Sequence, residues 1–281
     1  MILLLCLALQ ETTLEDSLSE LFKTLTDAQK TECLKRYDDP DRDAEVFTPG
    51  KRPGLLIAQL TDDQLKLLDG SIRRFLSSDG YAEAMKVARQ SHAKEGLKAY
   101  YLNFFGDATK EKAWAFRVSE HHLTLVHVTS DPLRFGPVLL GANPPDLWKS
   151  QEESAIACFG KLTDAEKKKA VVGGAAESGK PLGDKGIAIG ELSDDAKKAA
   201  IALIDAHLAL FSDAQQKKLR AILEAEGGAE KLRLAFFGAM TRRCADGGRA
   251  DWKIEGKHFL MDYESSRGHI HMTLRGAVEK K

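Results

Sequence analysis

The chain has 281 residues, of which 43% are apolar and 30% are charged. A chain of this length and composition can bury a full hydrophobic core, so a disordered protein is not expected. Its 41 basic and 42 acidic residues nearly cancel, so the charge gives no reason to expect binding to nucleic acid or to an anionic membrane surface.

The chain begins with an uninterrupted apolar run from Ile2 to Leu9. This run is too short to cross a bilayer as a helix, which needs about 20 residues, so no stable membrane insertion is expected. A short export signal over residues 1–10 fits the run, although no Lys or Arg precedes it. It predicts a periplasmic or extracellular protein; the alternative is a buried first strand or helix of a cytoplasmic one.

Five short motifs along the chain place a Ser or Thr and an Asp directly after a large apolar residue, as helix starts do. They begin at Leu25, Leu60, Leu162, Leu192 and Phe211. In four of the five, a Gln or Glu follows three residues after the hydroxyl and permits a capping box. Apolar residues at helical spacing also predict helices over residues 14–25 and 200–208.

Each half of the chain closes with a similar aromatic and β-rich block. The first contains Phe104-Phe105-Gly106, Trp114 and His121-His122-Leu123, and the second contains Phe236-Phe237-Gly238, Trp252 and His258-Phe259-Leu260. Strand-like runs follow over residues 137–140 and 269–274. The fold is therefore predicted to be α+β, with two diverged repeats packed as one compact unit. Each repeat, residues 11–145 and 146–281, is expected to be a helical segment followed by a three-stranded antiparallel β-meander, with the meanders packed edge to edge or face to face.

A glycine-rich segment over residues 172–190 contains a partial phosphate-binding motif, Gly174 to Lys180. Pro181 stands where that motif needs a Ser or Thr hydroxyl for Mg²⁺, and no helix follows. We therefore expect a surface loop and no nucleotide cofactor.

The four cysteines, Cys6, Cys33, Cys158 and Cys244, are widely spaced and form no Cys-x-x-Cys pair. This spacing excludes a dense disulfide framework. Buried free thiols are the favoured interpretation, with one disulfide as the alternative.

Five of the eight histidines fall in the two β-rich blocks: His121, His122, His258, His269 and His271. Residues two apart on a strand share a face, so His269 and His271 are predicted to present both imidazoles to one metal ion. Adjacent strand residues face opposite ways. At most one of His121 and His122 is therefore expected to join them, unless a bulge at Ser119-Glu120 redirects the chain.

The remaining histidines have weaker claims to a site. His92 is predicted to lie in a solvated loop or helix end, and His127 to continue a strand without a second partner. His207 falls on the apolar face of a helix, which indicates a core histidine.

Three or four imidazoles without a thiolate suit copper or zinc, or non-haem iron if a carboxylate such as Glu120 or Glu264 completes the set. Arg275 lies four residues after His271, a spacing that predicts the same strand face. There it would hold an anionic substrate or pair with an acid. The predicted metal ligands are His121, His122, His269 and His271, and the predicted catalytic residues are Arg275 and Glu120.

Several motifs together resemble the bacterial family known as domain of unknown function thirty-five hundred, over most of the chain. They are Leu25–Gln29, Asp38–Arg42, Arg52–Leu55, Gly80–Tyr81, Tyr101–Gly106, Trp114, His121–Leu123, Gly141–Pro144, His269–His271 and Arg275. The resemblance implies that the two histidine pairs and Arg275 form the site, and it implies no particular reaction. Members of that family often have Asp after this Arg, whereas Gly276 follows here.

These observations predict a metal-binding enzyme that acts on a small molecule. It would be an oxidoreductase or a hydrolase in which copper, iron or zinc activates dioxygen or water. The competing interpretation is a non-catalytic ligand-binding or scaffold module whose histidines form a structural polar cluster.

Overall fold

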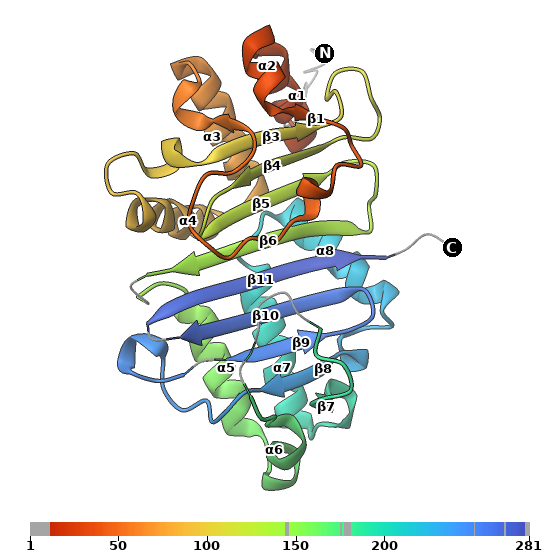
Figure 1. Cartoon of the computed structure of the whole chain (residues 1–281). Coiled ribbons are helices and arrows are strands. Elements are labelled where there is room, and N and C mark those ends of the chain that lie inside the picture. Colours follow the sequence, from red (N-terminus) through yellow and green to blue (C-terminus); the bar gives the residue numbers. More distant parts are fainter. Residues whose placement is uncertain are drawn as a thin grey trace, which may run out of the picture.

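The computed structural model describes residues 12–143, 146–174, 176, 181–249, 251–266 and 268–278. The apolar run and Cys6 lie outside this range, as does part of the glycine-rich segment. The chain forms a mixed α+β fold, as predicted, in which helices pack on one large sheet (Figure 1). Within the described ranges, no helix is long and apolar enough to span a membrane.

Among its described residues, 12–143, the first half contains four helices and then four long strands. The helices are α1 (Leu14–Thr24), α2 (Asp27–Cys33), α3 (Asp62–Phe75) and α4 (Ser78–Ser91), and the strands are β3 (Tyr101–Phe105), β4 (Ala115–Ser119), β5 (Leu123–Val128) and β6 (Arg134–Ala142). Two short strands, β1 (Leu34–Lys35) and β2 (Leu55–Leu56), pair with β3.

The second half follows the same general order. Its helices are α5 (Lys149–Lys161), α6 (Asp164–Ala170), α7 (Asp194–Leu208) and α8 (Asp213–Ala225), and its strands are β7 (Ile187–Ala188), β8 (Arg233–Phe236), β9 (Trp252–Glu255), β10 (Phe259–Ser266) and β11 (His269–Ala277). Each half thus has a meander of four long strands, where three were predicted. The extra strand went uncounted because residues such as those of β3 are buried on both faces and give no alternating pattern.

The two meanders join edge to edge, one of the two arrangements expected. The strand order is β1-β3-β4-β5-β6-β11-β10-β9-β8-β7, so β6 and β11 are neighbours at the centre of one sheet. They pair antiparallel, with Ile270 opposite Ala142 and Leu274 opposite Val138. This pairing places the last strand of the first half beside the last strand of the second half.

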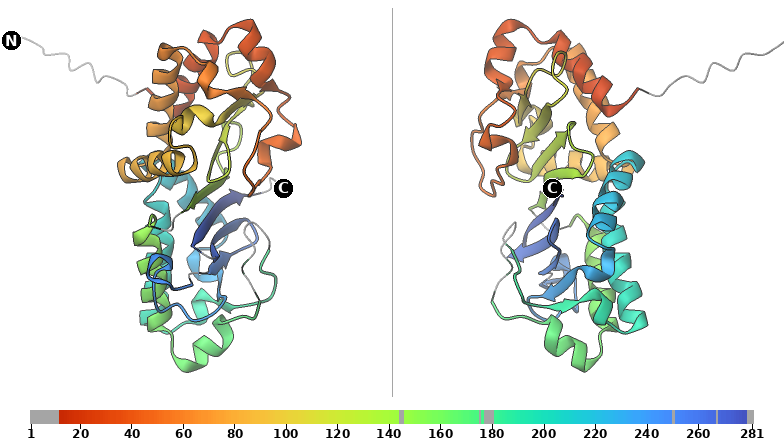
Figure 2. Two further views of the ribbon diagram at one scale, coloured as in Figure 1. Left: turned by 60° about the vertical axis from the view of Figure 1, so that its left-hand side comes forward. Right: turned by 90° about the vertical axis from the view of Figure 1, so that its right-hand side faces the viewer.

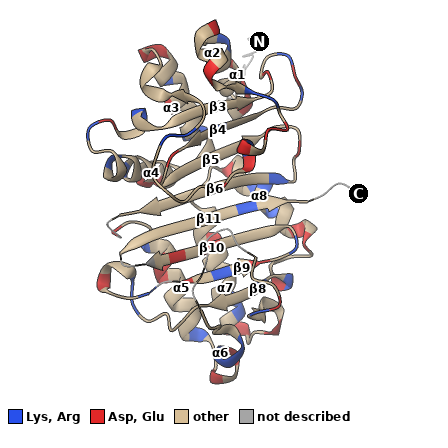
Figure 3. Cartoon of the chain, viewed as in Figure 1, with Lys and Arg blue, Asp and Glu red and all other residues tan. Residues whose placement is uncertain are grey.

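The two faces of the sheet are covered differently. Helices lie on one face (Figure 2), where apolar residues of alternate strand positions, such as Leu102, Leu125 and Met272, form the main core. The opposite face carries polar strand residues and is crossed by a strap, residues 36–54. Arg117 of β4 holds the strap by donating hydrogen bonds to the carbonyl oxygens of Asp41 and Ala44. Charges of both signs are dispersed over the molecule (Figure 3).

The predicted helix starts are confirmed at all five positions, with N-caps at Thr26, Thr61, Thr163, Ser193 and Ser212. The three threonines form complete capping boxes. Ser212 was expected to form a fourth, but its side chain makes no capping hydrogen bond.

The predictions for buried histidines and cysteines are confirmed in part. His207 is a core histidine whose Nδ1 lies 3.0 Å from the Leu203 carbonyl oxygen. Cys33, Cys158 and Cys244 are buried free thiols. His127 differs from its prediction, because it has a partner: its Nε2 lies 2.8 Å from Oε1 of Glu15 in α1.

The Glu15–His127 contact generates a prediction for acid stability. Its hydrogen bond with His127 lowers the pKa of Glu15 from 4.5 to about 2. A carboxylate whose pKa is lowered on folding stabilises the protein above its unfolded pKa, and this contribution disappears as the pH falls through the folded pKa. We expect the stability difference between wild type and Glu15→Gln to shrink as the pH falls from 4.5 to about 2, measured by urea unfolding. Glu20→Gln, at an exposed position of the same helix, is the control; an identical response of both variants would contradict the assignment.

Candidate metal centre

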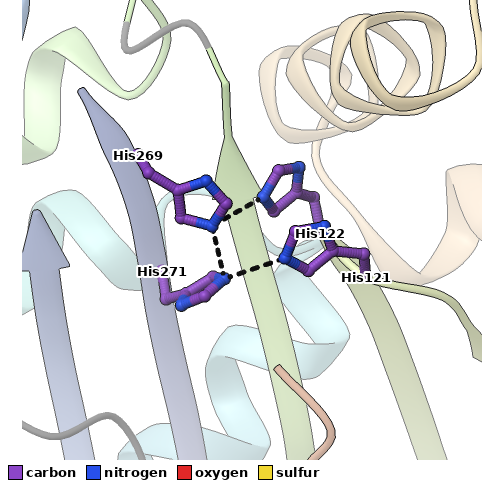
Figure 4. A group of neighbouring side chains, drawn as sticks. All are labelled: His121, His122, His269 and His271. Carbon is purple, nitrogen blue, oxygen red and sulfur yellow. Dashed lines mark hydrogen bonds between the residues drawn. The ribbon is translucent and has the colours of Figure 1, made fainter. Parts of the chain in front are cut away.

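Four imidazoles converge beside the central strand pair. His121 and His122 lie in the turn between β4 and β5, and His269 and His271 lie on the first residues of β11. Figure 4 shows the four rings pointing toward one another from these two segments. One potential ligand atom from each residue lies within 4.8 Å of all the others.

The nitrogen separations are close to those of a single coordination sphere. Nε2 of His122 lies 3.1 Å from Nε2 of His269, and that atom lies 3.0 Å from Nε2 of His271. Nε2 of His271 lies 3.4 Å from Nε2 of His121. Nitrogens bound tetrahedrally at about 2.0–2.1 Å from an ion are about 3.3–3.4 Å apart. The group therefore needs only small side-chain adjustments to surround one ion.

Hydrogen bonding among the rings cannot account for all three contacts. A neutral Nε2 offers either one N–H or one lone pair in the ring plane, so it enters one well-aligned hydrogen bond. His269 and His271 each contact two other nitrogens, and therefore at most two of the three contacts can be N–H···N bonds. A cation, by contrast, accepts all four lone pairs at once.

The electrostatic environment keeps the rings neutral. Burial, reinforced by the three neighbouring imidazoles, lowers the pKa of His122 to about 2. Burial and the neighbouring His269 and His121 lower the pKa of His271 to about 3. Burial also lowers the pKa values of His121 and His269. All four rings thus present the neutral form that binds metal ions.

His121 and His122 both reach the group, although strand alternation predicted that at most one would. The prediction was wrong because strand β4 ends at Ser119 and β5 begins at Leu123. The two histidines lie in the connecting turn, where alternation does not hold. Their rings stack at a centroid distance of 3.8 Å.

Gly141 of β6 makes room for the His122 ring. It lies opposite His271 in the sheet, and its N–H donates to the His122 carbonyl oxygen at 2.8 Å. A Cβ atom at this position would lie 2.6 Å from Cδ2 of His122 and 2.7 Å from the Ile270 carbonyl oxygen. Only glycine therefore allows the turn and β11 to approach β6 this closely.

The rings are fixed from behind by groups outside the cluster. Nδ1 of His122 lies 3.2 Å from Oγ of Ser91, at the end of α4. The backbone of Phe47 lies close enough to His121 to favour the protonated form of its ring, and the Phe47 ring packs on His271 with a centroid distance of 5.4 Å. A partner on the second ring nitrogen fixes the tautomer and orientation of a metal-binding histidine.

Glu120, a predicted catalytic residue, lies beside the group and belongs to its support. Its Oε1 accepts the Gly50 N–H at 3.0 Å, and its Oε2 lies 3.2 Å from Nε2 of His92. The carboxylate thereby ties the strap and α4 to the turn. His92, predicted to lie in a solvated loop or helix end, is the C-cap residue of α4 and makes this contact.

Arg275, the other predicted catalytic residue, lies on the same strand face as His271 but further from the cluster. Its Nη1 donates to Oε1 of Glu45 in the strap at 3.1 Å. Glu264 lies opposite His271 in β10. His258 lies in the turn between β9 and β10, apart from the four imidazoles. Within the described part of the chain, the converging group consists of the four histidines and contains no carboxylate.

Sequence reasoning missed Ser91, Phe47 and the role of Gly141 as parts of the site. Gly141 belongs to the Gly141–Pro144 motif, but the motif alone does not show why a glycine is needed at this position. Ser91 and Phe47 carry no pattern of their own, and only the fold brings them to the histidines.

The close packing of His122 against Gly141 predicts that adding one methyl group at residue 141 destabilises the protein. Gly141→Ala should displace the ring and lower the free energy of unfolding by about 1–3 kcal/mol, as overpacking does. Gly160→Ala in α5 is the matched control, since its Cβ would meet nothing within 4 Å, and it should leave stability equal or slightly raised. Urea unfolding of both variants tests this; equal free energies for Gly141→Ala and wild type would show that the close approach is not required.

The chain matches the model of a protein family. No curated protein and no solved structure matches the chain. The model of the family described as "Protein of unknown function (DUF3500)" matches residues 10–279, nearly the whole chain. The protein therefore belongs to this family.

Proposed function

We propose that the protein is a metal-dependent enzyme whose four imidazoles, from His121, His122, His269 and His271, hold one copper or zinc ion. The observation that carries the proposal is the convergence of four neutral imidazoles within 4.8 Å. Three of the rings are partly exposed, which leaves a side of the ion open to water or a substrate, as catalysis requires. The reaction would be an oxidation with copper or a hydrolysis with zinc.

The ligand chemistry favours copper and zinc over iron. Imidazole suits all three metals, but non-haem iron sites commonly include a carboxylate. The Glu120 carboxylate is engaged by Gly50 and His92. With nitrogen ligands alone, copper should bind more tightly than zinc, as expected from the general order of divalent-ion affinities.

Positive charge beside the cluster indicates the kind of substrate. The guanidinium of Arg52 is almost fully buried in the strap, donates to the Gly50 carbonyl oxygen at 3.2 Å, and lies close enough to His121 to lower its pKa. A buried cation near a metal ion favours an anionic ligand there. A small anionic molecule is therefore the proposed substrate.

The competing function is a non-catalytic module in which the histidines form a structural cluster. It requires the imidazoles to satisfy one another by hydrogen bonds, and the three nitrogen contacts exceed what neutral rings can supply. For this reason metal binding is the better interpretation.

Metal loading tests the proposal. Purified protein without a His tag, dialysed against copper or zinc and then freed of excess ion, should retain about one ion per chain. The His269→Ala/His271→Ala double variant should retain none, because two ligands are lost. The readout is elemental analysis, with circular dichroism to check that the variant is folded.

His258→Ala is the matched control, because it removes a histidine from the equivalent turn of the other half. It should bind as much metal as wild type. A wild-type protein that takes up neither ion, or a double variant that takes up as much as wild type, would overturn the proposal.

The choice of metal generates a separate prediction. In competition, equimolar copper should displace zinc from the wild-type site. The copper form should show the electron paramagnetic resonance splitting of several coordinated nitrogens. Retention of zinc under these conditions would identify a site built for zinc and favour hydrolysis over oxidation.

We also infer that the two halves, residues 11–145 and 146–281, are diverged copies of one unit. Matching neighbours support this: Glu15 of α1 contacts His127 of β5, and the carboxylate of Glu152 in α5 lies close enough to Tyr263 of β10 to raise the pKa of its hydroxyl. The two glutamates lie ten residues before the matching motifs at Leu25 and Leu162. Export through residues 1–10 remains a prediction from the sequence.

A further inference from the structure

A cavity of about 340 Å³ lies at the opposite end of the β6–β11 pair from the imidazole cluster. It is bounded by the first residues of β6, the turn between β9 and β10, and the last residues of β11. Its charged and titratable lining residues are Asp43, Arg134, Glu255, Lys257, His258 and Arg275. The volume is at the lower end of the range of about 300–1,000 Å³ typical of small-molecule sites.

The backbone around the cavity repeats the backbone around the cluster. The Glu120 N–H donates to the Leu123 carbonyl oxygen at 3.0 Å, and the Gly256 N–H donates to that of Phe259 at 2.8 Å. The Gly141 N–H donates to the His122 carbonyl oxygen at 2.8 Å, and the Ala277 N–H donates to that of His258 at 2.9 Å. The two turns therefore dock on the central strands in the same way.

This correspondence identifies the residues at the cavity that match the histidines of the cluster. Lys257 and His258 follow Gly256 as His121 and His122 follow Glu120. Arg134 pairs with Ala277 as His271 pairs with Gly141. Two of the metal-binding imidazoles are thus replaced by permanent cations, so this end of the strand pair repels metal ions and attracts anions.

The surrounding acids only partly balance these cations. Three cationic side chains, Arg134, Lys257 and Arg275, face the lining carboxylates of Asp43 and Glu255. Asp43 is shared, because Arg42 as well as Arg134 binds its Oδ2. Glu255 accepts the backbone N–H of Leu182. Positive charge is in excess only among the residues that line the cavity, because just outside it Glu45 pairs with Arg275 and Glu226 accepts the backbone N–H groups of Lys257 and His258.

We propose that this cavity binds a small oxyanion, a molecule bearing carboxylate or phosphate groups. The guanidinium of Arg134 and the ammonium of Lys257 supply the charge, and guanidinium forks match both kinds of oxyanion. Nδ1 of His258 donates to the Ala277 carbonyl oxygen at 3.0 Å, which fixes this ring at the cavity wall. The site is distinct from the metal centre and does not require it.

Calorimetric titration tests the site, with inorganic phosphate and citrate as separate probes at constant ionic strength. Wild type should bind at least one of them saturably at millimolar concentration, and the tighter probe identifies phosphate or carboxylate as the ligand group. Lys257→Glu should weaken binding about tenfold or more, since it reverses a charge at the cavity. Lys257 is exposed and lies in the turn between β9 and β10, outside the paired strand residues, so the variant should fold like wild type, as thermal melting will check.

Lys161→Glu, an equally exposed lysine at the end of α5, is the matched control and should bind like wild type. Absence of saturable binding for both probes would overturn the proposal. Equal weakening by Lys257→Glu and Lys161→Glu would also overturn it, because the effect would then reflect only the net charge of the protein.

Discussion

The antiparallel pairing of β6 with β11 is the interaction on which the rest of the structure depends. It joins two four-stranded meanders into one sheet and places Gly141 opposite His271. Histidines separated by 147 and 150 residues in the chain thereby come into contact. Without this pairing each half would hold only one pair of imidazoles, fewer than the three or four protein ligands that zinc sites use.

The site combines neutral imidazoles with rigid support. Burial keeps the imidazoles unprotonated, and the cost of burying polar rings is offset only if their lone pairs are satisfied. Ser91, Phe47 and the Glu120 carboxylate hold the surrounding segments from three directions. The strap is in turn fixed to the sheet by Arg117. The opposite end of the strand pair has the same backbone but positive side chains, so one architecture presents two contrasting chemistries.

Local signals predicted the parts of this fold that depend on local physics. Helix starts followed from hydroxyl and acidic residues that satisfy free backbone N–H groups, as at Thr26 and Thr163. The shared face of His269 and His271 followed from strand periodicity. The joining of His121 and His122 did not, because it depends on where β4 ends, and strand ends are set by tertiary pairing. The contact between Glu120 and His92 forms only because α4 packs against the turn, and no sequence periodicity predicts that packing.

The most direct test of the central claim is anomalous diffraction from crystals of the tag-free protein soaked in copper or zinc, recorded at the absorption edge of the metal. The account predicts one strong peak within about 2.0–2.1 Å of the Nε2 atoms of His121, His122, His269 and His271. The account would be contradicted if the strong peak lay elsewhere in the molecule. It would also be contradicted if no peak appeared between the four imidazoles after soaking with an excess of the metal ion.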